Sequence, residues 1–187
     1  MSPLWTGLII LGLLLVASAA AMILFYNSFV AKKLKVENSF SQIKIQCKKR
    51  FDLVPNLVET VKGYAKHEKE TLENVTTARS AGASANSVRD LARANNQLTE
   101  TLSKLFALGE QYPDLKANIG FVKLQDELSE IERTIAVSRS FYNDTVMIYN
   151  KAVRTFPGNV FASILKFKEA EFFDAPEAEL ENVRVSF

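Results

Sequence analysis

The chain has 187 residues, enough for one domain with a sizeable core and a membrane segment, and its 7 Gly and 5 Pro against 48% hydrophobic residues favour long regular elements. The net charge of +2 combines a basic stretch, 27–50, which has seven Lys/Arg and one acid, with an acidic remainder, 51–187. The single cysteine, Cys47, excludes an intramolecular disulfide, and the single histidine, His67, excludes a multi-histidine metal site within one chain.

An uncharged apolar run, Leu4–Val30, comes first. About 20 helical residues at about 1.5 Å each span a bilayer core of about 30 Å, so the run predicts a single transmembrane helix. A cleavable signal peptide is the rival interpretation, because Ala17-Ser18-Ala19 resembles a cleavage site; however, no Lys or Arg precedes the run, which also continues past that site. We therefore predict an uncleaved anchor over residues 1–31. Its anchor residues include Leu4, Trp5, Leu11, Leu14, Phe25 and Tyr26.

Basic residues follow the apolar run and predict its orientation. The candidate juxtamembrane cluster consists of Lys32, Lys33, Lys35, Lys48, Lys49 and Arg50. The positive-inside rule places the N-terminus outside the bacterial inner membrane and residues 31–187 in the cytoplasm. The cluster either only sets this topology or also attracts anionic lipid head groups, to which each cation near the surface contributes about 1 kcal/mol.

The next segment has a helical pattern with a proline inside it. From Val36 to Val75, apolar residues recur every three or four positions, which predicts an amphipathic helix with coiled-coil-like packing. Pro55 interrupts the pattern, because a proline in a helix removes one hydrogen bond and costs about 3 kcal/mol. Asp52 is a suitable cap for a new helix that has Pro55 in its first turn, so we predict a hinge, a kink or restart, at these two residues.

Two further helices follow. The small residues of Ser80–Ala85 predict the first loop, and Asn86 is the candidate cap of a second helix. Tyr112-Pro113-Asp114 then turns the chain into a third, long helix, which either Asp114 or Asn118 caps.

A second break and a short helix complete the predicted domain. Phe156–Asn159 ends the third helix, and a short fourth helix follows over 160–168. The predicted fold class is therefore all-α: one N-terminal transmembrane helix followed by an elongated antiparallel bundle of three long helices plus a short fourth, over residues 32–170.

The C-terminal tail, 171–187, is acidic and ends in an alternating segment. Such a segment is suited to adding to a sheet edge or docking in a pocket on a partner, and Val183, Val185 and Phe187 are the candidate docking residues. A frayed terminus is the alternative.

The sequence lacks a complete catalytic or metal-binding motif. The run from His67 to Thr71 has no second histidine at Thr71, which a zincin helix requires, and Tyr64 stands where a di-iron Glu-x-x-His motif needs its acid. The Lys48-Lys49-Arg50 run has no interleaved aromatic residues, so nucleic acid is not an expected partner. We predict no catalytic residue, no metal site and no cofactor.

Polar residues on or beside the apolar stripes form the remaining candidate site. They are Asp52, Asn56, Glu59, Asn95, Glu132, Arg139 and Asn143. One interpretation is a binding or metal site. We favour the other, a structural network in which Glu132 or Asp52 pairs with Arg139 or Arg50 and so determines helix register.

The stretch RFDLVPNLVETVKGYA, Arg50–Ala65, resembles the signature of the LemA family. The similarity continues in order along the chain, through Tyr26-Asn27, Tyr112–Asn118, Arg139–Asn143, Tyr149-Asn150, Thr155–Pro157 and Phe172-Phe173. The sequence departs from the family at Leu165-Lys166-Phe167, where a glycine more often precedes the aromatic residue.

The resemblance implies a single-pass bacterial membrane protein with a helical-bundle domain, and it implies no particular activity. By analogy, magnetosome proteins of the family are associated with forming a membrane compartment, and family genes often sit beside those for a membrane zinc protease.

Three functions are compatible with these observations. We expect a non-enzymatic, membrane-anchored helical scaffold, a homo-oligomer that organises the lipid bilayer or partner proteins. The second is an adaptor for a membrane protease or other envelope machine, docking through the C-terminal tail. The third is a metal-binding or hydrolytic protein, for which Glu59 and Glu132 are the first residues to test.

Overall fold

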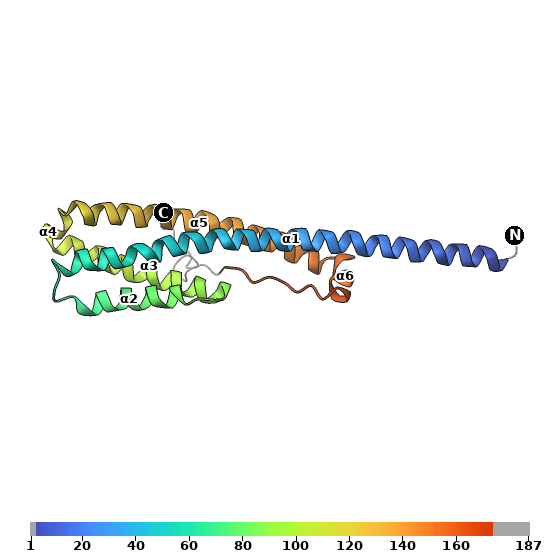
Figure 1. The fold of residues 1–187 in the computed structure, drawn as a ribbon, viewed down its shortest axis with the longest axis horizontal. Coiled ribbons are helices and arrows are strands. Elements are labelled where there is room, and N and C mark those ends of the chain that lie inside the picture. Colours follow the sequence, from blue (N-terminus) through green and yellow to red (C-terminus); the bar gives the residue numbers. More distant parts are fainter. Residues whose placement is uncertain (1–2, 174–187) are drawn as a thin grey trace, which may run out of the picture. The chain divides into compact units, whose positions relative to one another are not determined.

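A computed structural model describes residues 3–173 of the chain. Within this range the chain forms six α-helices, which Figure 1 colours in chain order, and no strand. They are α1 (Pro3–Lys62), α2 (Lys69–Ala83), α3 (Val88–Gln111), α4 (Pro113–Lys116), α5 (Ile119–Arg154) and α6 (Gly158–Ile164). The predicted all-α class, a long N-terminal apolar helix followed by a helical bundle, is confirmed.

The helices belong to two compact units. Of the described residues, 3–38 and 144–170 form unit 1, and 39–143 and 171–173 form unit 2. Thus α1 and α5 contribute to both units, α2, α3 and α4 belong to unit 2, and α6 belongs to unit 1. The segment boundaries expected from composition, at residues 31 and 170, stay predictions.

Unit 2 is a helical bundle with an aliphatic core. Its helices carry apolar side chains every three or four residues, so one stripe of each helix faces inward. Its most deeply buried side chains include Ile43, Leu57, Leu98, Leu105, Leu128 and Ile135. Burying one such side chain contributes about 1.5–3 kcal/mol, which makes this core the main source of stability for the unit.

Helix α1 continues through Pro55, so the restart predicted at Asp52 is wrong. The Asp52 carboxylate caps no helix and lies 2.8 Å from Lys48 Nζ. Pro55 has no N–H to donate to the carbonyl of Phe51, four residues earlier. Arg79 Nε, on α2, donates to that carbonyl oxygen at 3.3 Å. A neighbouring helix therefore replaces the hydrogen bond that the proline removes.

The first loop lies earlier than predicted. The sequence pattern predicts a loop at Ser80–Ala85, but α1 ends at Lys62 and α2 runs on to Ala83. The small residues of this segment allow close packing: a Cβ added to Gly82 would lie 2.2 Å from the Phe51 ring. The glycine therefore marks a close contact between helices. The predicted loop after it begins at residue 84, four residues later than expected, and the break over 63–68 was not predicted.

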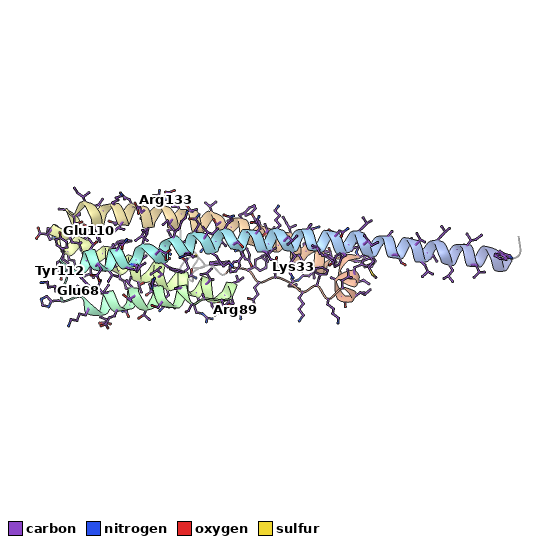
Figure 2. The ribbon with its side chains drawn as sticks, viewed as in Figure 1. Lys33, Glu68, Arg89, Glu110, Tyr112 and Arg133 are labelled. Atoms are coloured by element: carbon purple, nitrogen blue, oxygen red, sulfur yellow. The ribbon has the colours of Figure 1, made fainter. Side chains whose placement is uncertain are left out.

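Two side-chain hydrogen bonds join the turns at one end of unit 2. Tyr112 OH donates to Glu68 Oε1 at 3.1 Å (Figure 2), and Asn118 Nδ2 donates to Tyr64 OH at 2.9 Å. Asn118 also caps α5, because its Oδ1 accepts from Phe121 N at 2.9 Å. One of the two predicted caps of this helix is thereby confirmed.

The N-cap of α3 lies one residue after the predicted position. Ser87, and not the predicted Asn86, occupies the cap position, and its Oγ accepts from Asp90 N at 3.0 Å. Both residue types are good caps, so the sequence alone does not separate these neighbours.

Helix α6 ends at Ile164, earlier than predicted, in a Schellman motif. Phe167 N donates to Ala162 O at 2.9 Å, and Lys166 N donates to Ser163 O at 3.3 Å. The motif requires a left-handed residue after the helix, and Lys166 has φ 59°.

Candidate functional site

The membrane-length segment is the N-terminal part of α1. Among the described residues, α1 is the one helix long and apolar enough to cross a membrane by length and composition, with a mean hydropathy of 2.8 over its most apolar window. The predicted anchor residues Trp5, Leu11 and Leu14 are all more than half exposed. Leu4 also lies in α1. The helix therefore presents apolar side chains that unit 1 does not cover.

The end of this apolar segment packs against α6 within unit 1. The Phe25 ring stacks on Phe161, with ring centroids 4.4 Å apart and planes inclined by 12°. One turn further along α1, the centroid of the Phe29 ring lies 5.1 Å from that of Phe167. Tyr26, which follows Phe25 directly, meets the Phe167 ring edge-on, with centroids 5.9 Å apart. The predicted anchor residues Phe25 and Tyr26 thus join the apolar segment to the rest of unit 1.

The predicted basic cluster is divided by burial. Lys33, Lys35, Lys48 and Lys49 are exposed, and Lys32 is half-buried. Arg50 is only 3% exposed, because it falls on the buried stripe that includes Cys47 and Val54. The assignment of Arg50 to a basic surface is therefore wrong.

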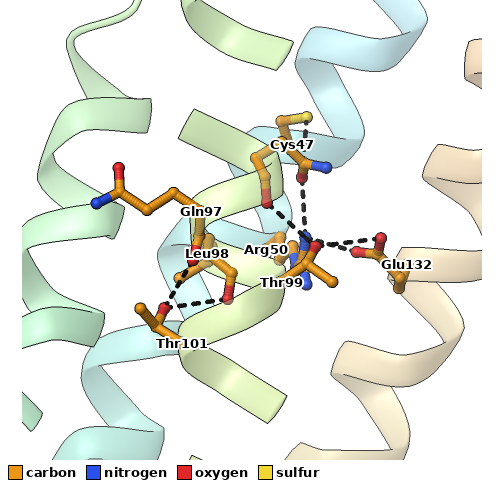
Figure 3. Close-up of polar contacts among 8 residues, drawn as sticks. Cys47, Arg50, Gln97, Leu98, Thr99, Thr101 and Glu132 are labelled. Atoms are coloured by element: carbon orange, nitrogen blue, oxygen red, sulfur yellow. Dashed lines mark hydrogen bonds and ion pairs between the residues drawn. The ribbon is translucent and has the colours of Figure 1, made fainter. Parts of the chain in front are cut away.

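Arg50 instead organises a buried polar cluster in unit 2 (Figure 3). Its Nη1 lies 2.5 Å from Glu132 Oε2 and donates hydrogen bonds to Asn95 Oδ1 and Thr99 Oγ1, each at 2.9 Å. Thr99 Oγ1 lies 3.3 Å from Glu132 Oε1. One guanidinium therefore links α1 to both α3 and α5. Of the pairings that the sequence leaves open, the structure forms the one between Glu132 and Arg50.

The electrostatics of this cluster follow from its burial. Burial lowers the pKa of the Arg50 guanidinium, and the Glu132 carboxylate counteracts this effect. Burial also raises the pKa of the neighbouring Cys47 thiol to about 12. Since a cysteine acts as a nucleophile or metal ligand through its thiolate, Cys47 is suited to packing and not to chemistry.

A pocket of about 290 Å³ adjoins the cluster. Its walls are Arg50, Thr99, Leu102, Ser103, Phe106, Leu128, Ser129 and Glu132. The one cation and the one anion in these walls already pair with each other, so the pocket offers little net charge to attract an ionic ligand. The arrangement is therefore better suited to determining which faces of the helices meet than to binding an ion.

A larger groove of about 770 Å³ lies between α1 and α2. It is lined by Val58, Lys62, Lys66, Lys69, Leu72, Glu73, Thr76 and Thr77. Three lysines and one glutamate surround two buried aliphatic side chains, so the groove has a net positive rim over an apolar floor. Such a groove is suited to an acidic, partly apolar segment of a partner.

Three other predicted network residues lie on the exposed side of α1, away from the Arg50 cluster. Asp52, Asn56 and Glu59 lie exposed on α1, where the carboxylate of Glu59 pairs with Lys62 at 2.6 Å. Arg139 is half-buried on α5. Of the seven predicted residues, the structure brings Asn95 and Glu132 together at this cluster.

Asn143 has a different task, which it shares with Asn150. Asn143 Oδ1 accepts from Phe173 N at 2.9 Å, and its Nδ2 donates to Phe173 O at 3.1 Å, within unit 2. In unit 1, Asn150 makes the same two-way pairing with the backbone of Ala170, at 2.8 and 2.9 Å. Each asparagine thus binds an extended residue as a neighbouring β-strand would.

A tyrosine precedes each of these asparagines and adds a third bond. Tyr142 OH donates to Glu171 O and Tyr149 OH to Lys168 O, both at 2.7 Å. Burial is the main cause that raises the pKa of Tyr142 to about 12, so the hydroxyl keeps its proton. We call Tyr142-Asn143 and Tyr149-Asn150 the Tyr-Asn clamps; both hold residues of the extended segment 167–173.

Comparison with known proteins decides the family. The model of the LemA family matches residues 39–187 of the chain. The chain belongs to the LemA family.

Relatives in this family include magnetosome proteins. Magnetosome protein MamQ 2 of Paramagnetospirillum magneticum is 25% identical over 202 aligned positions, covering 94% of this chain and 74% of that protein. Protein LemA of Metamycoplasma hominis is 27% identical over 161 residues, covering 86% and 74%. Magnetosome protein MamQ of Magnetospirillum gryphiswaldense is 24% identical over 185, covering 85% and 68%. The apolar helix and these relatives are consistent with a single-pass membrane protein.

The LemA resemblance points to residues that the polarity pattern misses. Its repeated Tyr-Asn pairs, seven residues apart, correspond to the two clamps. The resemblance thus adds Tyr142, Tyr149 and Asn150 to Asn143, which the polarity pattern already includes. Thr99, by contrast, has no such signal, although it lies one turn after Asn95 on the same helix.

The predicted docking residues Val183, Val185 and Phe187 lie outside the described residues. Within residues 3–173, no group of three or more His, Cys, Asp or Glu side chains is placed to hold a metal ion. The expectations of no catalytic residue and no cofactor stay predictions.

Proposed function

We propose that this LemA-family protein is a non-enzymatic, membrane-anchored scaffold that self-associates and organises membrane or partner proteins. The observation that carries the proposal is the composition of α1. One helix supplies both the membrane-length apolar segment and the buried stripe of unit 2 that includes Ile43 and Leu57. Any protein that binds unit 2 is thereby held at the membrane.

The polar interior supports a structural role. Arg50, Glu132, Asn95 and Thr99 bind one another across three helices, and the Tyr-Asn clamps bind backbone atoms of the same chain. These groups act in holding helices and an extended segment in place. The absence of enzymatic activity is part of the proposal.

An exposed apolar position on α5 suggests where copies meet. Val137 is 71% exposed and Phe141, one turn further, is 52% exposed. Apolar residues at i and i+4 form a stripe that a helix of a second copy can cover. Self-association through this α5 stripe would make the scaffold a homo-oligomer.

Disulfide crosslinking in native membranes tests this proposal. A Val137→Cys variant in a Cys47→Ala background should form a covalent dimer under mild oxidation. Asn74→Cys, at an exposed position on α2, is the matched control and should remain monomeric. A protein that stays monomeric in native membranes with every crosslinker would overturn self-association.

The orientation is also proposed. The exposed lysines after the apolar segment support an N-terminus outside the bacterial inner membrane and unit 2 in the cytoplasm. A membrane-impermeant thiol reagent applied to intact cells should therefore leave Asn74→Cys unlabelled until the membrane is opened. Labelling of this cysteine in intact cells would show that the orientation is the opposite of the one proposed.

An adaptor role for a membrane protease or another envelope machine is the second candidate. The groove between α1 and α2, with Lys66 and Lys69 on its rim, is the observation that favours it. Lys66→Glu/Lys69→Glu should abolish co-purification of a partner, whereas Lys123→Glu on α5 should not. Deleting residues 183–187 tests the alternative docking element in the tail, and a partner retained by both variants would remove this candidate.

A further inference from the structure

Helix α6 has an apolar face that unit 1 leaves exposed. On α6, Ile164 is 58% exposed and Val160, one turn earlier, is 48% exposed; Phe156, in the turn just before the helix, is 82% exposed. On the opposite side of α6, Gly158 and Ala162 are buried. The short helix is therefore apolar on both sides, although only one side is covered by protein.

The buried side of α6 packs against the end of the apolar segment of α1. Phe161, on α6, stacks on Phe25, and Figure 1 shows α6 beside α1 in unit 1. The helical residues 3–24 precede Phe25 and rise about 33 Å, close to the roughly 30 Å of a bilayer core. Phe25 therefore marks the end of the segment that fits within the hydrocarbon, and α6 lies at that end.

The first charged residue of the chain gives a second measure of depth. It is Lys32, seven residues after Phe25. Seven helical residues rise about 10 Å, which is similar to the thickness of one layer of lipid head groups, roughly 5–8 Å. Residues 25–31 of α1, and the α6 side chains that touch them, thus fall within the interfacial layer.

The charged residues around α6 are also typical of a segment in the interfacial layer. Residues 144–170 contain four Lys/Arg and two acids. Lys151 is exposed near the end of α5, and Lys166 and Lys168 are exposed just after α6. Cations beside an exposed apolar face are typical of segments that lie in the surface of a membrane with anionic lipids.

We propose that the exposed apolar residues of α6, Val160 and Ile164, together with Phe156 in the turn before it, insert into the head-group boundary of the bilayer that α1 crosses. The partner is the lipid surface on the side where Lys32 leaves the membrane. This contact gives the protein a second attachment beside its single anchor, and it rests on the proposed membrane crossing by α1. It holds unit 1 against the surface while the anchor passes through.

Depth-dependent quenching tests the insertion. The full-length protein, in a Cys47→Ala background, is reconstituted into phosphatidylcholine vesicles containing phosphatidylglycerol. An environment-sensitive fluorophore is attached in turn to Val160→Cys, Ile164→Cys, Asn74→Cys and Leu14→Cys. Spin-labelled lipids should remove roughly half of the emission at 160 and 164, because interfacial apolar faces lie about 5–10 Å deep. The label at Asn74→Cys should be unaffected.

Each result decides the proposal. Quenching at 160 and 164 supports it. Quenching at Leu14→Cys but not at 160 or 164 overturns the insertion and leaves the anchor in place. A blue shift at 160 without lipid quenching shows that a second protein copy covers the face, which also overturns it. If Leu14→Cys itself is not quenched, both the anchor and the insertion are wrong.

Discussion

Arg50 Nη1 lies 2.5 Å from Glu132 Oε2, yet the two side chains differ in burial: Arg50 is 3% exposed and Glu132 35%. The cation is enclosed by the bundle, whereas the anion reaches its rim. Removing one partner of a buried pair costs more when the remaining charge has no access to water. Removing the carboxylate and removing the guanidinium should therefore lower the free energy of unfolding by different amounts.

Glu132→Gln should destabilise unit 2 by about 3–5 kcal/mol, because it leaves a buried guanidinium without a counter-ion. Arg50→Met should cost less, about 1–3 kcal/mol, since water can hydrate the remaining carboxylate. Urea unfolding of the detergent-solubilised protein, followed by circular dichroism, measures both values.

The exposed pair Lys104 and Glu100 provides the control, and Glu100→Gln should leave the unfolding midpoint unchanged. Combining Arg50→Met with Glu132→Leu should recover much of the lost stability, because no buried charge remains. Equal losses for the two single variants would show that the pair is not enclosed as described.

Cys47 should make stability depend on alkaline pH. Burial raises the pKa of its thiol from 9.0 to about 12, the Glu132 carboxylate acts in the same direction, and the Arg50 charge opposes them. The folded thiol therefore holds its proton more tightly than the unfolded one. This contribution to stability is complete below pH 9.0 and is lost as the pH rises from there towards 12.

Unfolding curves across that alkaline range, compared with those of Cys47→Ala, measure this effect. The wild-type protein should lose more stability than the variant. Its thiol should also react with alkylating reagents far more slowly than that of Val137→Cys in a Cys47→Ala background. A Cys47 that reacts as fast as this exposed cysteine would contradict the burial.

Pro55 and Arg79 should be energetically coupled through the carbonyl of Phe51. Pro55→Ala restores the helical N–H donor and should stabilise unit 2, by less than the roughly 3 kcal/mol that an uncompensated proline costs. Arg79→Met should destabilise the wild type but have a much smaller effect once Ala occupies position 55. A double-mutant cycle by urea unfolding measures this coupling; additive effects would show that Arg79 does not replace the missing bond.

The two asparagines of the Tyr-Asn clamps should protect separate amides. Asn150→Ala should accelerate hydrogen exchange at Ala170, and Asn143→Ala should do so at Phe173, each by roughly fivefold, which corresponds to a net hydrogen bond of about 1 kcal/mol. Asn159→Ala, at an exposed position on α6, is the matched control. Unchanged exchange at both amides would contradict the clamps.

Lys166→Gly should stabilise unit 1. Lys166 has φ 59°, and a left-handed conformation costs a residue with a Cβ about 1–2 kcal/mol. Glycine avoids this cost but loses more entropy on folding, so we expect a net gain of about 1 kcal/mol. Lys168→Gly, in the extended segment, should give no such gain. Thermal unfolding monitored near α6 distinguishes the two variants.

Local signals explain the successful predictions. The uncharged run before Lys32 indicates a membrane-length helix, and Asn118 indicates a helix start, because both depend on neighbouring residues. The Arg50–Glu132 pair is one of the pairings that the sequence leaves open, because both residues lie beside apolar stripes. Its choice over Arg139 depended on how the helices pack.

The errors at Pro55, Gly82 and Arg50 share one physical cause, which is a contact from another helix. Proline and small residues usually mark breaks, but Arg79 supports the helix at Pro55 and the Phe51 ring requires Gly82. The same applies to Arg50, which composition assigns to a basic surface and packing encloses. These contacting residues are distant from one another in the sequence, so no local sequence pattern predicts the contacts.

By itself, the sequence determined the all-α class, the apolar segment and the likeness to the LemA family, because periodicity, hydropathy and motif order are properties of the chain. Only the tertiary structure decided that α1 passes through Pro55, that Arg50 lies inside, and that Asn143 and Asn150 hold an extended segment. Each of these outcomes depends on an atom from a distant part of the chain, and folding alone brings that atom within hydrogen-bonding distance.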